Sequence, residues 1–249
     1  MPSSHHSSIG ASLYRLGRTL ADLIFPPTCV ACKQPGSILC DHCAQRVEPV
    51  SHPICPRCGR AHADASHPLC SLCQADPNPV LSLARAAALH SEPLRTMIHH
   101  FKYSKQPELA EPLVRYLIAA YAKAEWRQVS SIDLVIPVPM FSERQKERGY
   151  NQAELLARHF SHVTHLPFTA NALKRTRFTQ AQVGLNAKER QRNVEDAFMA
   201  HPNVKGRTIL VIDDVYTTGA TLHACAKALV EAGSFQVYAL ALATPTARQ

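Results

Sequence analysis

Two neighbouring acids and a run of small hydroxyl residues make the segment 206–222, GRTILVIDDVYTTGATL, the part of the chain best suited to chemistry. The carboxylates of Asp213 and Asp214 can accept hydrogen bonds from a sugar diol. A small-residue loop that opens a helix presents backbone N–H groups to a phosphate. A diol site beside a phosphate site predicts the binding of a ribose 5-phosphate group. The loop residues are Thr217, Thr218, Gly219, Ala220 and Thr221.

Cysteine is the other residue type arranged for chemistry, because eight of the nine cysteines form four C-x-x-C pairs between residues 29 and 73. Each C-x-x-C turn directs two thiolates at one ion, and a second turn completes the tetrahedron that Zn²⁺ prefers. Metal binding would also supply folding energy to a region too short and polar for a core of its own. The alternative is redox-active or disulfide-forming cysteines. The predicted zinc ligands are, in two sets, Cys29, Cys32, Cys40 and Cys43, and Cys55, Cys58, Cys70 and Cys73.

The spacing leaves the grouping of these pairs open. Taking them in chain order is simplest, but a cross-braced arrangement, first with third and second with fourth, also fits. His42, His62 and His67 lie close enough in the sequence to replace a thiolate. Each four-thiolate zinc site would carry a formal charge of about −2. We therefore do not expect this region to be the main contact for nucleic acid.

Positive charge is concentrated in one part of the chain. The 249 residues carry a formal net charge of +8, and residues 144–192 contain ten Lys and Arg against three Glu. Such a segment favours an acidic partner, either phosphates, a nucleic acid or an anionic surface. No apolar run reaches the roughly 18–20 residues of a membrane span, and the N-terminus is unlike a signal peptide. We therefore expect a cytoplasmic protein whose reduced cysteines bind metal.

The residues before the acid pair predict the element that positions it. Residues 208–212 form an apolar, β-branched run without alternation, which is typical of a strand buried on both faces of a parallel sheet. The loop after the acids would then lead into a helix over residues 222–232, and strands alternating with helices predict an α/β fold. The other predicted strands are 81–90, 132–138, 168–173 and 236–243; the other predicted helices are 92–101, 109–126 and 187–198, with one more after a loop that holds Arg144 and Arg148.

Composition divides the chain into three parts. Residues 1–24 combine a Ser- and His-rich tail with apolar residues at helical spacing, which predicts an amphipathic helix that docks the small domain. Membrane association of that helix is the alternative. Residues 25–76 hold the cysteine pairs and form a predicted double zinc-ribbon domain. A Pro-rich hinge follows, and residues 80–249 form the second predicted domain.

The segment VIDDVYTTGAT resembles the signature of type I phosphoribosyltransferases, which bind phosphoribosyl pyrophosphate (PRPP). A longer series resembles the ComF family from about Phe25 to Ala243: FPPTCVAC, CPRCG, VIPVP, RGYNQAELLAR, RTRFTQAQVGLNAKERQRNV and VIDDVYTTGAT, in this order. Two features depart from the family pattern. Lys33 stands where a glycine often follows the second cysteine of a knuckle, and the Ser/His tail is extra. The resemblance implies a type I phosphoribosyltransferase fold, a parallel sheet flanked by helices, preceded by a small zinc-ribbon domain.

The resemblance also implies roles for individual residues. Asp213 and Asp214 would hold the ribose hydroxyls, and the loop 217–221 would hold the 5-phosphate. Arg144 and Arg148 would contact the pyrophosphate, because an arginine fork can hold two phosphate oxygens at once. Mg²⁺ would bridge the pyrophosphate oxygens. The alternative for these arginines is a solvated basic helix start. Arg175 would join the site from a mobile lid formed by Lys174 to Gln182.

The function implied is a role in natural transformation or in the use of external DNA, with PRPP as ligand and single-stranded DNA as a second partner. The predicted DNA contacts are Arg175, Arg177, Lys188, Arg190 and Arg192. The basic segment has few aromatic residues for base stacking, among them Tyr150 and Phe178, so we expect contacts mainly through phosphates. One alternative is an active phosphoribosyltransferase that acts on a nucleobase-like acceptor. Another is a non-catalytic zinc adaptor for a DNA helicase or recombination mediator.

Overall fold

The computed structural model describes residues 26–51, 53–62, 64, 66–76, 79–129, 131–177 and 187–245. Two compact units, residues 1–46 and 47–249, divide the chain and are described separately. The predicted tail and amphipathic helix (1–24) and residues 178–182 of the predicted lid (174–182) lie outside the described residues, as do the side chains of Lys188 and Arg190. The predicted domain boundary between residues 76 and 80 stays a prediction.

Over its described residues, 26–46, the smaller unit contains the first cysteine set and the short helix α2 (Asp41–Gln45). Its first turn is closed by a hydrogen bond of 2.8 Å from Cys29 N to the carbonyl of Gln34. Lys33, just after the second cysteine, has a φ of 65°. That left-handed conformation costs a side-chain-bearing residue about 1 kcal/mol, so the departure from glycine noted in the sequence has a physical cost here.

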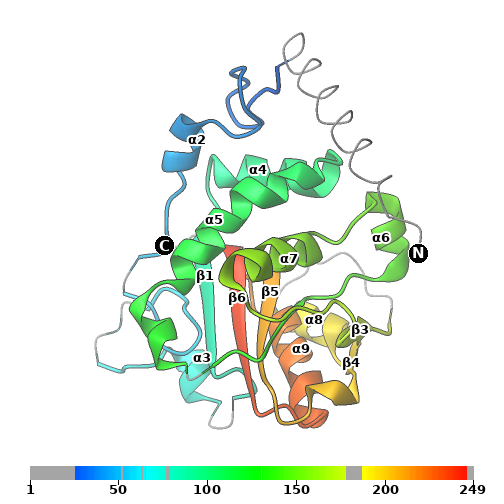
Figure 1. The fold of residues 1–249 in the computed structure, drawn as a ribbon. Helices are drawn as coiled ribbons and strands as arrows, with labels where there is room; N and C mark the ends of the chain where they lie inside the picture. The colour runs from blue at the N-terminus through cyan, green and yellow to red at the C-terminus, as the bar shows by residue number, and fades with distance from the viewer. Residues whose placement is uncertain are drawn as a thin grey trace, which may run out of the picture. The chain divides into compact units, whose positions relative to one another are not determined.

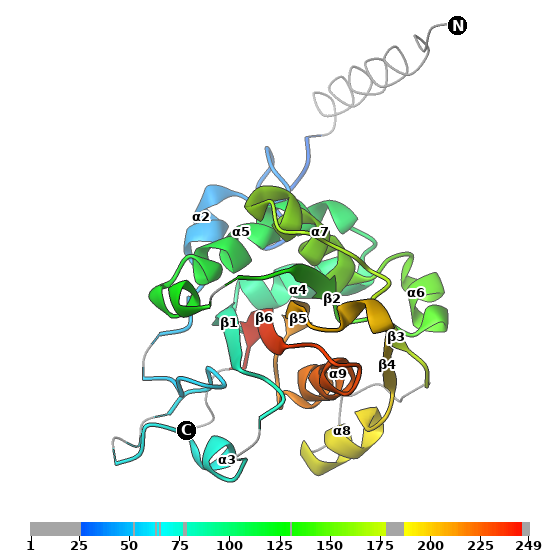
Figure 2. The ribbon, with the colours of Figure 1, turned by 60° about the horizontal axis from the view of Figure 1, so that its bottom comes forward.

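The larger unit is built on a four-stranded parallel sheet with the strand order β1-β6-β5-β2 (Figures 1 and 2). The strands are β1 (Leu83–Leu89), β2 (Leu134–Pro137), β5 (Thr208–Val215) and β6 (Gln236–Thr244). In the central strands, Val211 lies opposite Ile136 on one side and Ala239 on the other. Ile209 to Ile212 are fully buried, which agrees with the prediction of a strand covered on both faces.

Helices cover both faces of this sheet (Figure 2). On one face α5 (Ala110–Tyr121) and α7 (Gln152–Thr164) pack on the strands, with α4 (Leu94–Tyr103) beside them. On the other face lies α9 (Ala220–Glu231), which contacts α8 (Ala187–Val194). The remaining elements are α3 (Ser71–Gln74), α6 (Ser142–Arg148), the antiparallel pair β3 (Leu173–Arg175) and β4 (Phe198–Ala200), and the 3-10 helices η1 (Pro107–Leu109), η2 (Ala124–Gln128) and η3 (Pro202–Val204).

Four elements differ from the sequence prediction. The predicted helix over 109–126 ends at Tyr121, and the 3-10 helix η2 follows it. The segment predicted as a loop with two arginines is the helix α6, which buries none of its residues and therefore lacks the apolar period that would have marked it. The predicted helix over 187–198 ends at Val194, because Asp196 takes a φ of 50° and β4 follows. The predicted strand over 168–173 is mostly irregular: Phe168 only bridges to Val135, and β3 begins at Leu173.

The outer edge of β1 is covered by the segment that leads into the second cysteine set. Val50 N donates to the carbonyl of Ala87 at 3.2 Å, and Ala84 N donates to the carbonyl of Arg57 at 2.9 Å. Covered edges cannot pair with another chain. These bonds also attach the second cysteine set to the sheet, within the same compact unit.

Candidate functional site

The acid pair lies at the carboxyl end of β5. The strand continues through both acids to Val215, so that the carboxylates emerge at the edge of the parallel sheet where α/β proteins bind ligands. Asp214 N donates a hydrogen bond of 2.8 Å to Asp213 Oδ1. Lys102 Nζ, at the end of α4, lies 2.8 Å from Asp214 Oδ1.

A cavity of about 420 Å³ opens over these carboxylates. Its lining brings together seven of the ten residues predicted to bind PRPP, which are Arg144, Arg148, Arg175, Asp213, Asp214, Thr217 and Thr221. The other three, Thr218, Gly219 and Ala220, lie between the two lining threonines and lead into α9. A cavity of this size is typical of a site for one small ligand.

The loop from Thr217 to Thr221 has a fixed backbone at its start and at its glycine. Tyr216, which is buried, donates from its backbone N to the carbonyl of Ala243 at 2.8 Å, and its own carbonyl accepts from Thr244 Oγ1 at 2.9 Å. Gly219 has a φ of +82°, and a Cβ there would lie 2.7 Å from Tyr216 Cε2. Only glycine fits this position. The loop ends at the N-terminus of α9, the positive end of a helix dipole.

Burial and the neighbouring Asp214 charge raise the pKa of Asp213 to about 7, against the opposing effect of Lys102 and Arg175. A carboxyl group in this position is therefore only partly ionised near neutral pH. Proton release is accordingly coupled to anything that requires the Asp213 carboxylate.

Cationic side chains also line the cavity. Arg148 donates to Gln152 Oε1 at 2.6 Å, and its guanidinium carbon lies 5.2 Å from the ring centre of Tyr103. Arg175 packs over the Phe198 ring at 5.4 Å, and its burial lowers its pKa. With Arg144 these groups make a wall that suits a group carrying several negative charges.

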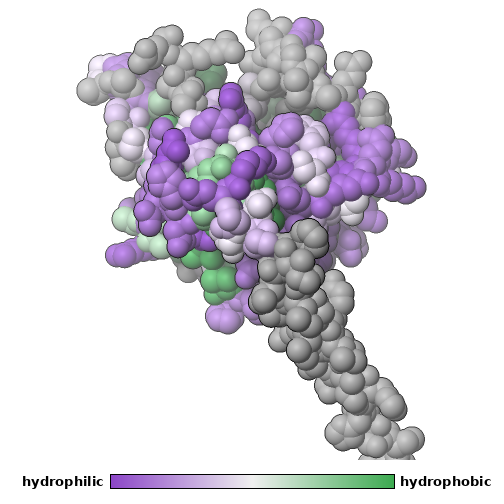
Figure 3. Space-filling view, turned by 90° about the horizontal axis from the view of Figure 1, so that it is seen from above, coloured by the Kyte–Doolittle hydropathy of each residue, from purple (hydrophilic) through white to green (hydrophobic). Residues whose placement is uncertain are grey.

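The predicted DNA contacts are divided between the cavity and its surroundings. Arg175 lines the cavity, whereas Arg177 is exposed and donates to the carbonyl of Glu195 at 2.6 Å. Arg192 is exposed on α8. On the face shown in Figure 3, hydrophilic residues predominate and apolar residues form small separate groups.

Several cavity residues come from α4 and from the end of β1, outside the motifs that predicted the site. Lys102 and Tyr103 follow an apolar helical pattern, and nothing in that pattern indicated that they reach residues more than a hundred positions away. The Tyr103 side chain is 60% exposed, so the site contains an accessible aromatic ring outside the basic segment. The members of this group are His90, Arg95, His99, Lys102 and Tyr103.

The eight cysteines form two clusters in chain order. In each cluster the four sulfur atoms lie within 4.8 Å of one another. The cross-braced arrangement that spacing allowed is therefore wrong, and each cluster is complete without a histidine. The two sets are Cys29, Cys32, Cys40 and Cys43, and Cys55, Cys58, Cys70 and Cys73.

The chemistry of both clusters fits zinc. Burial opposes ionisation of Cys29, but backbone N–H groups led by those of Cys40 and Cys32 lower its pKa to about 6. In the second cluster burial again opposes, and the backbone N–H groups of Cys58 and Cys70 lower the pKa of Cys55 to about 6. Burial and the neighbouring cysteines raise the pKa of Cys43 and Cys73, an effect that a bound cation would offset. Thiolates are the form that zinc binds. Each cluster therefore has the four-cysteine ligand set of a structural zinc site.

In the part of the chain that the structure describes, every helix is too short or too polar to cross a membrane. This finding concerns the described helices alone.

Two protein families match separate parts of the chain. The double zinc ribbon domain matches residues 20–78, and the phosphoribosyl transferase domain matches residues 146–249. Solved structures with a related arrangement include an adenine phosphoribosyltransferase from Thermoanaerobacter pseudethanolicus, 12% identical over 57% of this chain and 83% of that one, with a TM-score of 0.34. Because this TM-score is low, the fold is identified by the family matches and the parallel sheet and not by this structure. The larger unit has the type I phosphoribosyltransferase fold.

Several relatives are similar over most of their length. DNA utilization protein YhgH from Escherichia coli is 34% identical over 168 residues, 66% of this chain and 73% of the relative. Its counterpart in Salmonella typhimurium is 31% identical over 233 residues, 86% of this chain and 96% of the relative. Competence protein F from Haemophilus influenzae is 37% identical over 158 residues, 61% of this chain and 69% of the relative. Together with the zinc ribbons and the phosphoribosyltransferase fold, these similarities show that the chain belongs to the ComF family.

Proposed function

We propose that the cavity binds PRPP with Mg²⁺ and that the protein uses this ligand while handling single-stranded DNA during transformation or the use of external DNA. The observation that carries the proposal is the cavity lining, in which the acid pair, two loop threonines and three arginines meet. The printed names of the relatives, a DNA utilization protein and a competence protein, support the DNA part. The reduced thiols that zinc needs favour a cytoplasmic location.

Each wall of the cavity has a part in this proposal. The ribose diol would donate hydrogen bonds to Asp213 and Asp214. The 5-phosphate would lie on the loop 217–221 at the N-terminus of α9, where backbone N–H groups and the helix dipole favour an anion. The pyrophosphate would face Arg144, Arg148 and Arg175, and Mg²⁺ would neutralise part of its charge.

The DNA part rests on the position of the basic residues. Arg175 belongs both to the cavity lining and to the predicted DNA contacts, and Arg177 and Arg192 are exposed nearby in the sequence. A DNA strand that contacts these side chains through its phosphates would share Arg175 with the pyrophosphate. We therefore propose that PRPP and single-stranded DNA affect each other's binding.

Calorimetry tests the proposal directly. Titration of PRPP with Mg²⁺ into the full chain, with and without a single-stranded oligonucleotide, should give one site per chain and an affinity that changes when DNA is present. DNA binding should weaken steeply as salt rises, and Arg177→Glu with Arg192→Glu should weaken it further. Absence of PRPP binding would refute the ligand assignment. DNA binding that ignores salt and both substitutions would refute the DNA assignment.

A second cavity favours the alternative of an active phosphoribosyltransferase. It has a volume of about 290 Å³ and shares Pro139, Met140, Asn151 and Arg175 with the first. An acceptor placed there would lie next to the first cavity, on the side that contains Arg175. Pyrophosphate release from PRPP in the presence of a nucleobase would support this alternative, and its absence with every base would favour the binding function. Normal transformation with Asp213→Asn and Asp214→Asn would instead favour a zinc adaptor for a helicase or recombination mediator.

A further inference from the structure

Arg60, two residues after the cysteine that ends the third C-x-x-C pair, reaches the loop assigned to the phosphate. Its guanidinium donates a hydrogen bond to the carbonyl of Thr218 and lies over the ring of Tyr216, 5.2 Å from the ring centre. A Cβ placed on Gly219 would lie 2.9 Å from Arg60 Nη2. One side chain of the second ribbon therefore lies against Tyr216, Thr218 and Gly219.

The backbone of Arg60 is fixed by the metal-binding turn. Its carbonyl accepts a hydrogen bond of 2.8 Å from Cys55 N, and Gly59 N donates to the carbonyl of Cys55 at 2.9 Å. These bonds close the turn that presents Cys55 and Cys58 to the zinc site. The position of the Arg60 side chain thus depends on the same turn that holds the metal ligands.

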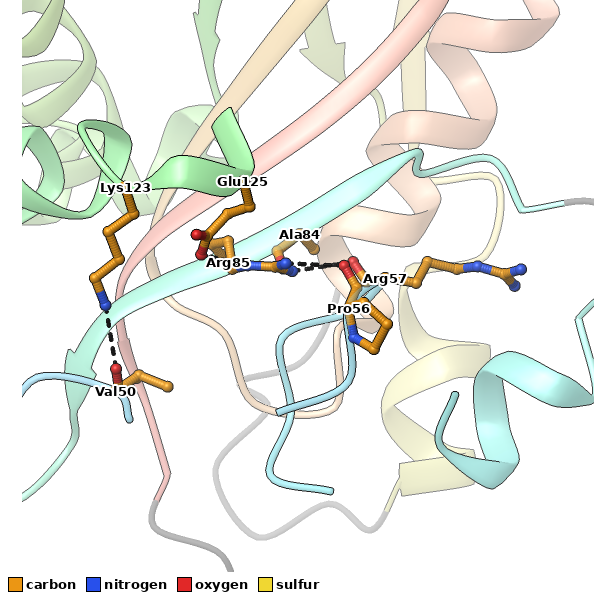
Figure 4. Close-up of polar contacts among 7 residues, drawn as sticks. All are labelled: Val50, Pro56, Arg57, Ala84, Arg85, Lys123 and Glu125. Carbon is orange, nitrogen blue, oxygen red and sulfur yellow. Dashed lines mark hydrogen bonds and ion pairs between the residues drawn. The ribbon is translucent and has the colours of Figure 1, made fainter. Parts of the chain in front are cut away.

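The ribbon in turn is attached to the edge of the sheet (Figure 4). Arg85 Nη2 on β1 donates to the carbonyl of Pro56 at 2.8 Å, and Gly59 packs so closely that a Cβ there would lie 2.6 Å from the carbonyl oxygen of Ala84. Arg57 crosses to the second half of the ribbon, where it donates to the carbonyls of Cys73 at 2.8 Å and Asp76 at 2.7 Å. Both halves of the ribbon are therefore tied to the strand that leads toward the cavity.

Arg60 contacts a part of the loop that does not line the cavity. Thr217 and Thr221 line the cavity, whereas Arg60 contacts the intervening Thr218 and Gly219. The directions of the loop N–H groups depend on the backbone that Arg60 holds, and preorganised N–H groups bind an anion without a reorganisation cost.

We propose that the second zinc ribbon braces the phosphate loop, and that Arg60 is the positioning residue through which zinc in the Cys55 to Cys73 cluster sets the loop conformation. The proposal rests on the proposed function for the identity of the ligand, but the brace itself can be tested without one. Because coupling between two sites is reciprocal, a sugar phosphate in the cavity should also slow the loss of zinc from this ribbon.

The first test measures hydrogen exchange by mass spectrometry over residues 216–221 of the zinc-loaded full chain. Arg60→Ala should speed exchange in this loop by about tenfold or more, while Arg60→Lys, which keeps one donor, should recover part of the protection. Exchange in the β5–β6 core should not change. Arg115→Ala is the matched control, because Arg115 is exposed on α5 and donates to the nearby carbonyl of Pro112. Zinc content should remain at two ions per chain in all three variants.

The second test uses ribose 5-phosphate as the probe and Cys55→Ser as the variant that lacks the second zinc. Arg60→Ala and Cys55→Ser should each weaken binding by about tenfold, within the usual range of coupling between sites. Failure of the wild-type chain to bind the probe would count against the proposed function alone. Unchanged loop exchange in Arg60→Ala, with both zinc ions present, would overturn the brace whatever the ligand result.

Discussion

Lys102 Nζ lies 2.8 Å from Asp214 Oδ1, although the two residues are 112 positions apart. Their side chains are 21% and 14% exposed, so that the ion pair is only partly screened by water. The pair joins the end of α4 to the end of β5 and supplies a cation to the acid pair before any ligand binds. A ribose diol must therefore share Asp214 with Lys102.

We predict that this ion pair contributes measurable free energy of unfolding. A double-mutant cycle with Lys102→Met and Asp214→Asn should give a coupling of about 1 kcal/mol in urea unfolding with zinc present. Lys227 and Asp196 form the control pair, at 3.0 Å but with side chains 48% and 78% exposed, and should give at most about 0.5 kcal/mol. Equal coupling in the two pairs would show that burial of Lys102 and Asp214 has no effect.

The raised pKa of Asp213, about 7 because of burial and the Asp214 charge, predicts how ligand binding depends on pH. A diol needs the ionised carboxylate, so affinity for PRPP with Mg²⁺ should rise as pH increases from 6 to 8, and binding should release protons. Since PRPP also titrates in this range, the measurement is the difference between the wild-type chain and Asp213→Asn. The variant should show a flatter profile; identical profiles would contradict the assignment.

The raised pKa of Asp213 also determines how the free energy of unfolding depends on pH. Because the folded-state pKa lies above the unfolded value of about 3.9, the folded chain holds this proton more firmly. The contribution of Asp213 to the free energy of unfolding is therefore lost as pH rises through about 7. Asp213→Asn should lose less stability than the wild-type chain between pH 6 and pH 8, with zinc content checked at both values.

Arg85 should be one of the most sensitive charged residues of the larger unit. Its side chain is 8% exposed and lies 3.0 Å from Glu125, and it also donates to the carbonyl of Pro56. Arg85→Met leaves a half-buried carboxylate without its cation, and should lower the free energy of unfolding by about 3 kcal/mol. Arg95→Met is the matched control, because Arg95 and Glu92 are 64% and 47% exposed, and should cost less than about 1 kcal/mol. Similar losses for both variants would contradict this explanation.

The two cysteine turns predict opposite responses at equivalent positions. Lys33 and Gly59 have φ values of 65° and 68°. Lys33→Gly relieves a left-handed conformation and should strengthen zinc retention by the first ribbon up to about fivefold, whereas Gly59→Ala adds a Cβ 2.6 Å from the Ala84 oxygen and should cost at least about 2 kcal/mol. Competition with a chelator measures the first effect and urea unfolding the second. An unchanged free energy of unfolding in Gly59→Ala would contradict the close packing of ribbon and strand.

Much of this arrangement could be predicted from local patterns. The run from Ile209 to Ile212 indicated a buried parallel strand because its residues are apolar without alternation, and the structure confirms it. The cysteine spacing identified all eight ligands, since a C-x-x-C turn is a local geometry. Neither inference needed to know what lies next to the segment in space.

The features that the sequence did not reveal depend on contacts between distant segments. The grouping of the cysteine pairs remained open because spacing does not specify which turns meet. Lys102 and Arg60 carried no local signal, because their partners, Asp214 and Thr218, lie 112 and 158 positions away. Helix α6 was not predicted because an exposed polar helix has no apolar face whose spacing would show the helical period.

The crystal structure of the chain with PRPP and Mg²⁺ is the most direct test of the central claim, that the cavity at the end of β5 receives a ribose 5-phosphate group. We predict that the 5-phosphate accepts hydrogen bonds from backbone N–H groups of residues 217–221 and that the ribose hydroxyls bond to Asp213 and Asp214. A ligand bound elsewhere, with Lys102 and Asp214 still paired over an empty cavity, would contradict the claim.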